Sequence, residues 1–144
     1  MKRAFYSGLF MILCASAATA QEIKATPLRT DHPLVGAWKI ELPELSCYEM
    51  LNLRANGTKR TMSGKEISES IFQMSAYPSP RGFYKWVDKI IKNNGKPDCT
   101  GDITPIGDIA VSYIYLHPDG TRFLLCAAEN LNECIGPYVR QEAI

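Results

Sequence analysis

The chain has 144 residues, of which 46% are hydrophobic, and its 16 basic and 15 acidic residues give a formal net charge of +1. This length is typical of one domain with a core of its own. A net charge so close to zero provides no strong field to attract nucleic acid or an anionic membrane, so we expect neither as a partner.

The first twenty residues have the layout of a secretory signal peptide. Lys2 and Arg3 precede an apolar stretch, and Ala18-Thr19-Ala20 offers a small-x-small cleavage site. The apolar stretch is shorter than the roughly 20 residues that span a bilayer, so we expect no stable membrane insertion. Cleavage between Ala20 and Gln21 removes two basic residues and leaves a net charge of −1 on a secreted or periplasmic protein.

The segment 21–33 is polar, has no apolar periodicity and contains Pro27 and Pro33. We interpret it as a flexible leader. The expected organisation is therefore a signal peptide over 1–20, this leader over 21–33 and a single β-barrel domain over 34–144.

After Leu34 the turn residues are those of β-hairpins. Asn56-Gly57 and Asp119-Gly120 are dipeptides that favour tight turns between antiparallel strands, and Asn94-Gly95 is a third candidate. Eight closely spaced strands of this kind are typical of a closed barrel or a sandwich. The expected strands are Ala37–Leu42, Cys47–Arg54, Thr58–Met62, Ile67–Ala76, Gly82–Lys92, Ile109–His117, Thr121–Ala127 and Ile135–Gln141.

The segment 83–92 carries a competing pattern. Its apolar residues recur at the spacing of an amphipathic helix, and Gly95 and Pro97 would end such a helix. The local pattern favours a helix, whereas the aromatic and β-branched content and the hairpins on either side favour a strand. We predict a strand here, with one short helix around 83–92 as the alternative.

Four cysteines lie beyond the signal peptide, and an even count in a secreted chain predicts two disulfides. Three pairings are possible. Cys126 and Cys134 bracket a plausible turn, so we expect them to join that hairpin and Cys47 to pair with Cys99. No two cysteines have Cys-x-x-Cys spacing and the chain has only two histidines, so we expect no structural metal.

Gly36 and Trp38 form a Gly-x-Trp element on the first expected strand, and Arg140 lies on the last one. This arrangement resembles the lipocalins and the broader calycin superfamily. The resemblance implies an up-and-down eight-stranded barrel that holds a small apolar molecule. It also implies that Trp38 and Arg140 are structural and seal the closed end of the barrel, where an arginine can stack on an indole.

An eight-stranded barrel is just wide enough to be filled by side chains or to hold one small ligand. The candidate lining is aromatic and soft and consists of Phe72, Met74, Tyr84, Trp86, Tyr113 and Tyr115. Tyr113 and Tyr115 share one face of their strand, with Ile114 and Leu116 on the other. Either face is a good interior, so the pattern leaves their orientation open.

The sequence contains no recognisable catalytic constellation or phosphate loop, and the cysteines are expected to be oxidised, so we expect a non-enzyme without cofactors. The first candidate function is binding of a small apolar ligand. The alternative is a protein-binding role, as an inhibitor of an envelope enzyme or a toxin-immunity protein. For that role the loop 76–82 offers Tyr77 and Arg81 as interface anchors.

Overall fold

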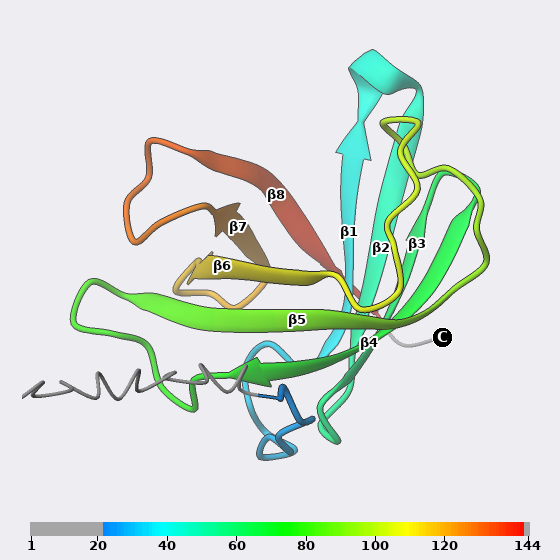
Figure 1. The fold of residues 1–144 in the computed structure, drawn as a ribbon. Helices are drawn as coiled ribbons and strands as arrows, with labels where there is room; N and C mark the ends of the chain where they lie inside the picture. The colour runs from blue at the N-terminus through cyan, green and yellow to red at the C-terminus, as the bar shows by residue number, and fades with distance from the viewer. Residues whose placement is uncertain (1–21, 143–144) are drawn as a thin grey trace, which may run out of the picture.

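The structure, a computed structural model, describes residues 22–142, so the expected signal peptide and its cleavage site lie outside the described residues. Within this range eight antiparallel strands form a closed barrel in which each strand pairs with the next and the last returns to the first (Figure 1). No helix in this part of the chain is long and apolar enough to cross a membrane. The hairpin pattern predicted a closed barrel or a sandwich and the resemblance implied an up-and-down barrel; the all-β, up-and-down barrel is confirmed. The strands are β1 (Gly36–Leu42), β2 (Cys47–Leu53), β3 (Thr58–Ser63), β4 (Glu66–Met74), β5 (Phe83–Asn93), β6 (Ile109–Leu116), β7 (Arg122–Cys126) and β8 (Cys134–Gln141), with a 3₁₀ turn, η1 (Pro43–Leu45), between β1 and β2.

The segment 83–92, whose local pattern favours a helix, belongs to strand β5, which confirms the strand prediction. The register of β5 against β4 shifts between Glu69 and Ser70, and the shift leaves Ile91 as an extra residue on β5. Such a bulge changes which residues face the barrel interior. The helix-like spacing of apolar residues is therefore that of a bulged strand.

The barrel closes where Trp38 of β1 pairs directly with Arg140 of β8. The guanidinium carbon of Arg140 lies 4.1 Å from the centroid of the Trp38 ring. The indole is fully buried, and its N–H donates to a backbone carbonyl four residues earlier over 3.0 Å. The guanidinium also donates to the carbonyls of Pro33, Val35 and Gly120. One side chain thus joins the last strand to the first strand, to the segment before it and to the turn before β7.

Gly36 is required by the approach of this arginine. Its φ is +132°, a conformation that side chains rarely adopt, and a Cβ at this position would lie 2.8 Å from Arg140 Nη1. Any other residue would strain the backbone and displace the guanidinium. The Gly-x-Trp element therefore has a structural cause in the contact with β8.

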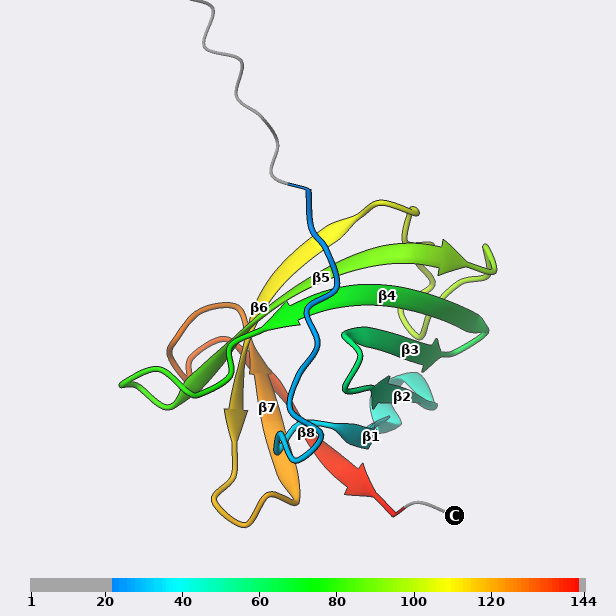
Figure 2. The ribbon, with the colours of Figure 1, turned by 90° about the horizontal axis from the view of Figure 1, so that it is seen from below.

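The segment before β1 lies against the same end of the barrel. The Thr26 N–H donates to the Phe72 carbonyl over 3.2 Å, and the Leu28 N–H donates to the Ala55 carbonyl over 2.7 Å. Figure 2 shows this segment crossing β4 on its way to β1. We call this end of the barrel, where odd-numbered strands begin, the sealed end, and the opposite end the open end.

His32 anchors the segment at the sealed end. Its imidazole is buried, with Nε2 3.2 Å from the Ser75 carbonyl and Nδ1 3.3 Å from the Leu34 N–H. A neutral ring protonated at Nε2 satisfies both contacts, since Nε2 then donates and Nδ1 accepts. Burial lowers the pKa of His32 below its ordinary value.

Both expected disulfides are present with the expected pairing. Cys47–Cys99 spans 52 positions and ties the start of β2 to the long loop between β5 and β6. Cys126–Cys134 joins the end of β7 to the start of β8. In the chain-entropy account such bridges each stabilise by about 2–4 kcal/mol, with the longer loop gaining more.

Replacing Arg140 with alanine is expected to lower the free energy of unfolding by about 2–4 kcal/mol, because it removes a cation–π contact and leaves backbone carbonyls without a donor. Urea denaturation followed by tryptophan fluorescence measures this loss. Arg60→Ala, at an exposed position on β3, is the matched control and should change stability by less than about 0.5 kcal/mol. Equal losses in the two variants would contradict the role given to Arg140.

The pH dependence of stability tests His32. Because its folded pKa lies below the unfolded value of about 6.5, the unfolded chain binds more protons in the interval between the two. The free energy of unfolding should therefore fall as the pH drops below about 6.5 and approaches the folded pKa. In His32→Gln this contribution should vanish, so the difference between variant and wild type in urea denaturation should narrow with acidification. A difference that stays constant with pH would show that protonation of His32 has no effect.

Candidate functional site

Four of the expected lining residues lie together in the barrel interior. Phe72, Met74, Tyr84 and Trp86 are all buried and belong to the main apolar cluster, which also includes the sealing residue Trp38. Phe72 and Trp86 meet edge to face with centroids 6.3 Å apart. The sealed end of the interior is therefore apolar and aromatic.

Tyr113 and Tyr115 lie elsewhere. Between them Ile114 is fully buried in the core cluster, so the aliphatic face of β6 points inward. Both tyrosines are only partly buried, and Tyr115 packs against Phe83 with centroids 5.1 Å apart. They belong to the outer face and do not join the interior set, which corrects their expected place.

A polar wall faces the interior from β3 and β4. Its buried members are Lys59, Thr61, Ser63, Glu66, Ser68 and Ser70. On β4 this reverses the usual alternation, since Ile67 is 39% exposed while Glu66 and Ser68 on either side of it are buried. Residues of this type inside a barrel are ordinarily hydrogen-bonded to other protein groups or to ordered water, or they serve a ligand.

Lys59 is the centre of this wall. Its ammonium lies 2.8 Å from Asp88 Oδ2 and 4.8 Å from the centroid of the Trp86 ring. Only 9% of the Lys59 side chain and 12% of the Asp88 side chain remain exposed. The hydrogen bond to Asp88 uses one of the three N–H donors of the ammonium and leaves two for other acceptors.

Four polar atoms around this ion pair are buried without a hydrogen-bond partner among the described residues. They are Thr61 Oγ1, Ser70 Oγ, Trp86 Nε1 and Asp88 Oδ1. Ser70 is the direct cross-strand partner of Lys59. Leaving a buried polar group unpaired costs about 1–3 kcal/mol, so four such groups in one place are expensive to keep.

The free hydrogen-bonding capacity of this cluster is rich in donors. The indole N–H and the ammonium only donate, the two hydroxyls donate or accept, and only the Asp88 oxygen is restricted to accepting. The complementary group is a carbonyl, carboxylate or hydroxyl oxygen. The aromatic rings of Phe72 and Trp86 adjoin this cluster and suit an apolar body attached to such a group.

Toward the open end the wall becomes acidic. Glu66 is buried and accepts a hydrogen bond from Asn93 Nδ2 over 2.8 Å. Burial raises the pKa of Glu66, and the nearby carboxylates of Asp98 and Glu49 raise it further. The Tyr138 hydroxyl donates to Glu49 Oε1 over 2.9 Å, and burial together with this carboxylate raises the pKa of Tyr138.

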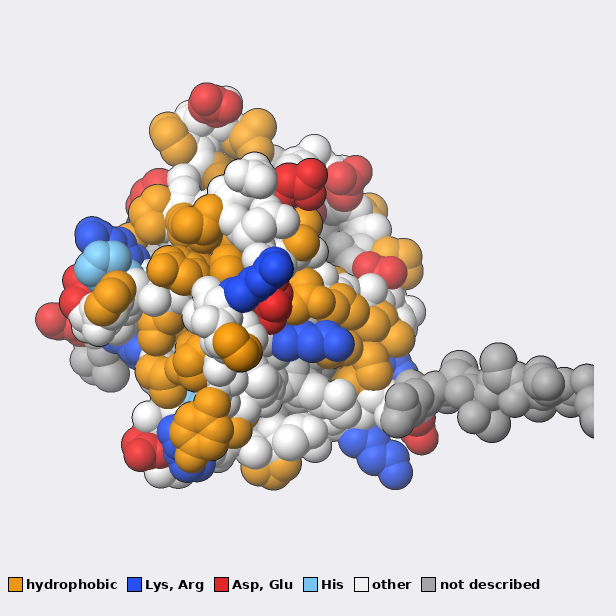
Figure 3. Space-filling view, turned by 90° about the vertical axis from the view of Figure 1, so that its left-hand side faces the viewer, with side chains coloured by type: hydrophobic (Ala, Val, Ile, Leu, Met, Phe, Trp, Pro, Cys, Tyr) orange, Lys and Arg blue, Asp and Glu red, His pale blue; other side chains and the backbone are white. Residues whose placement is uncertain are grey.

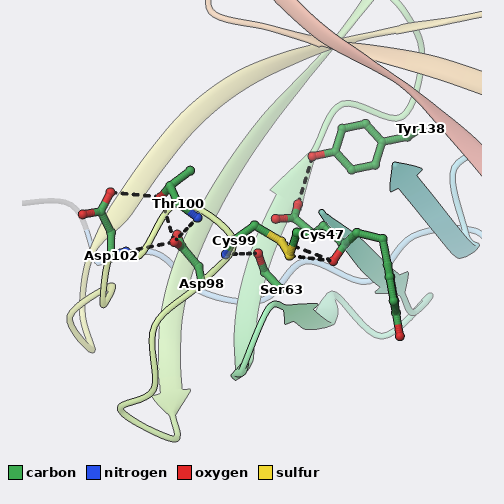
Figure 4. The surroundings of a disulfide bond; sticks show 9 residues. Cys47, Ser63, Asp98, Cys99, Thr100, Asp102 and Tyr138 are labelled. Carbon is green, nitrogen blue, oxygen red and sulfur yellow. Dashed lines mark hydrogen bonds between the residues drawn. A yellow bond between two sulfur atoms is a disulfide. The ribbon is translucent and has the colours of Figure 1, made fainter. Parts of the chain in front are cut away.

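The disulfide Cys47–Cys99 lies beside this acidic region, as Figure 4 shows. The Cys99 N–H donates to Ser63 Oγ over 3.2 Å, which fixes the long loop to the inner edge of β3. Next to it, Asp98 accepts hydrogen bonds from the N–H groups of Thr100 and Asp102 at 2.8 and 3.0 Å. Burial disfavours the Asp98 carboxylate, but these hydrogen bonds outweigh it and hold its pKa below the ordinary value. The part of the rim formed by the loop around Cys99 is therefore held to β2 and β3.

The barrel wall is incomplete at the open end. β1 and β8 pair only over Ala37–Lys39 of β1, and β6 and β7 pair only from Tyr113 onward. The hairpin of β7 and β8 therefore separates from both neighbouring strands, and a hollow of about 520 Å³ lies beside it. Val111, Leu125 and Ile135 are among the residues that line this hollow.

The two expected interface anchors in the loop 76–82 make contacts within the protein. Tyr77 is 69% exposed, but its ring faces the Arg29 guanidinium at 4.9 Å. Arg81 donates to the Glu129 carbonyl over 3.3 Å. Topology places this loop at the sealed end, between β4 and β5.

Sequence reasoning missed Lys59 and Asp88 because charged residues on alternating strands are ordinarily assigned to solvent. One signal was available on β4. Ser68 and Ser70 are in phase with Phe72 and Met74, which were expected inside. Extending that phase along the strand would have predicted a polar inner wall.

Comparisons with protein-family models, curated proteins and solved structures found no match for this chain.

Glu66→Gln is expected to raise the free energy of unfolding at neutral pH. A raised folded pKa means that the ionised carboxylate is less stable in the folded protein, so its cost appears as the pH rises through the unfolded value of about 4.3 to the folded one. The amide keeps an oxygen for Asn93 and carries no charge. The gain should disappear below about pH 4, where wild-type Glu66 is neutral in both states. Urea denaturation at both pH values measures it, and a gain that is independent of pH would contradict the burial of a charge at this position.

Proposed function

We propose that the protein is a secreted or periplasmic, non-enzymatic, lipocalin-like barrel that binds one small and largely apolar molecule in its interior. The observation that carries the proposal is the set of unpartnered polar atoms around Lys59 and Asp88, next to the aromatic interior. Natural cores seldom keep several such atoms together, and functional sites are where the cost is tolerated.

The proposed ligand carries an oxygen acceptor on an apolar body. The acceptor meets the Lys59 ammonium, the Trp86 N–H and the Ser70 hydroxyl, while the body lies against Phe72 and Met74. A carboxylate or a carbonyl fits this donor set better than an amine, since an amine would compete with Lys59 for Asp88 and leave the donors unpaired. Entry is from the open end, because the sealed end is covered by the segment before β1.

The proposed location rests on the two disulfides, which persist in oxidising compartments. The non-enzymatic role is supported by the use of His32, whose two ring nitrogens both contact backbone groups. The alternative role as an inhibitor or immunity protein that uses the loop 76–82 has weaker support, because Tyr77 and Arg81 are engaged by Arg29 and Glu129.

Isothermal titration with decanoate, decanol and decylamine tests the proposal. We expect decanoate and decanol to bind with quenching of tryptophan fluorescence and a raised melting temperature, and decylamine to bind at least about tenfold more weakly. Ser70→Ala and Thr61→Val remove hydroxyls that have no hydrogen-bond partner within residues 22–142. Each should therefore leave the melting temperature unchanged or raise it, yet weaken decanoate binding by about three- to tenfold.

Lys92→Met, at an exposed position on β5, is the control for Lys59→Met. Only the Lys59 variant should lose decanoate binding. Ser70→Ala and Thr61→Val, which should keep their melting temperature, show that weaker binding does not arise from unfolding. If none of the three amphiphiles binds at millimolar concentration, ligand binding in the barrel is wrong. If Ser70→Ala and Thr61→Val lower the melting temperature and leave binding unchanged, the cluster is structural.

A further inference from the structure

One half of β6 has a strand partner on a single side. Ile109–Ser112 pair with β5, but the register of β6 with β7 begins only at Tyr113, opposite Cys126. β7 ends at Cys126, whose disulfide to Cys134 joins it to the start of β8. A strand edge of this kind presents backbone N–H and C=O groups that can pair with another extended chain.

This short edge is apolar and has no charged side chain, proline or bulge of its own. Ile109 and Val111 are each 50% exposed, and Ala110 between them is also exposed. Folded proteins normally protect such edges with lysine, proline or a bulge, and Ile109–Ser112 contains no charged residue or proline. An unprotected apolar edge in a secreted barrel favours a binding role.

A hollow lies directly beside the edge and suits the side chains of an added strand. Its volume is about 520 Å³. Val111 and Ser112 of β6 line one side, and the β7–β8 hairpin lines the other with Leu125, Cys134 and Ile135. Apolar side chains are also exposed over a large part of the face shown in Figure 3, the left-hand side of Figure 1, where the loop 76–82 and the loop between β7 and β8 lie.

The loops next to this edge have a single sign of charge. The segments 98–108 and 127–133 contain no lysine or arginine, and their acidic residues are Asp98, Asp102, Asp108, Glu129 and Glu133. Asp108 immediately precedes the edge, and Glu133 is on the lining of the hollow. Basic residues at the ends of an incoming strand complement these carboxylates.

We propose that Ile109–Ser112 is the docking edge for an extended peptide segment of a partner protein, apolar in its middle and flanked by lysine or arginine. The peptide adds a strand to β6, and its alternate side chains enter the hollow beside Val111 and Ile135. A second copy of the chain is a poorer occupant, because pairing two such edges would bring the acidic loops of both copies together. This role is separate from ligand binding in the interior.

A synthetic peptide, acetyl-Lys-Val-Thr-Val-Thr-Val-Lys-amide, serves as the probe, and full-length protein binding is followed by NMR titration and amide hydrogen exchange. We expect slower exchange confined to Ile109–Ser112 and the neighbouring hairpin. Two peptides N-methylated on alternate residues are matched controls. Only alternate amides of an added strand face β6, so one of the two should lose at least about tenfold in affinity while the other keeps it.

Variants of the protein separate the edge from the rest of the surface. Val111→Lys should abolish peptide binding, whereas Val139→Lys, at a similarly exposed position paired on both sides, should not. Asp108→Asn with Glu133→Gln should weaken binding by about three- to tenfold and reduce its dependence on salt. The proposal is overturned if the peptide does not bind at millimolar concentration or if both N-methylated peptides bind as well as the parent. It is also overturned if sedimentation shows a homodimer whose protected amides are those of Ile109–Ser112.

Discussion

The stacking of Arg140 on Trp38 is the contact on which closure of this barrel depends. Only three residue pairs join β1 to β8, and the arginine lies on the central pair. Its guanidinium also hydrogen-bonds the segment before β1 and the turn before β7, so these contacts strengthen the short junction between β1 and β8. The absence of a side chain at Gly36 is part of the same contact, because the guanidinium occupies the space that a Cβ would need. With the junction confined to this end, the β7–β8 hairpin is free to separate from its neighbours at the other.

The interior also differs between the sealed end and the polar wall. Aromatic and aliphatic side chains gather around Trp38 at the sealed end, and a polar wall of β3 and β4 faces them. Burying the Lys59–Asp88 pair is not an efficient way to stabilise a small domain, since a hydrophobic pair of similar volume is often as stable or more so. The packing of the sealed end and the two disulfides stabilise the fold instead, so the polar wall is not needed for stability. The unpaired hydroxyls of Thr61 and Ser70 add a cost that packing alone does not explain.

Sequence reasoning predicted the strands and the disulfide pairing because turn dipeptides, short β-rich runs and cysteine spacing are local signals, whereas the choice of an up-and-down barrel over a sandwich came from the resemblance. It also brought Gly36, Trp38 and Arg140 together through a resemblance, and the structure gives the physical reason. What it could not predict depends on the direction in which a strand faces. Tyr113 and Tyr115 looked as suitable for the interior as Ile114, and only the packing of the neighbouring strands decides between them. The polar wall was missed for the same reason, since a strand with isoleucine outside and serine inside reverses the pattern on which prediction relies.

The two proposed sites lie on opposite sides of one strand pair. Trp86, which borders the polar cluster, pairs across the sheet with Ser112, the last residue of the unpaired edge of β6. A peptide strand added at that edge would extend the wall at the point where it is incomplete and cover the hollow beside Val111. It would thereby narrow the open end, which is the proposed entry for a ligand. A peptide that only blocks the open end would slow both entry and escape of the ligand and leave its affinity unchanged. A peptide that shifts Trp86 would change the affinity for the ligand, and by reciprocity the ligand would change the affinity for the peptide by the same factor. The Trp86–Ser112 pair is therefore the direct route by which one proposed site could influence the other.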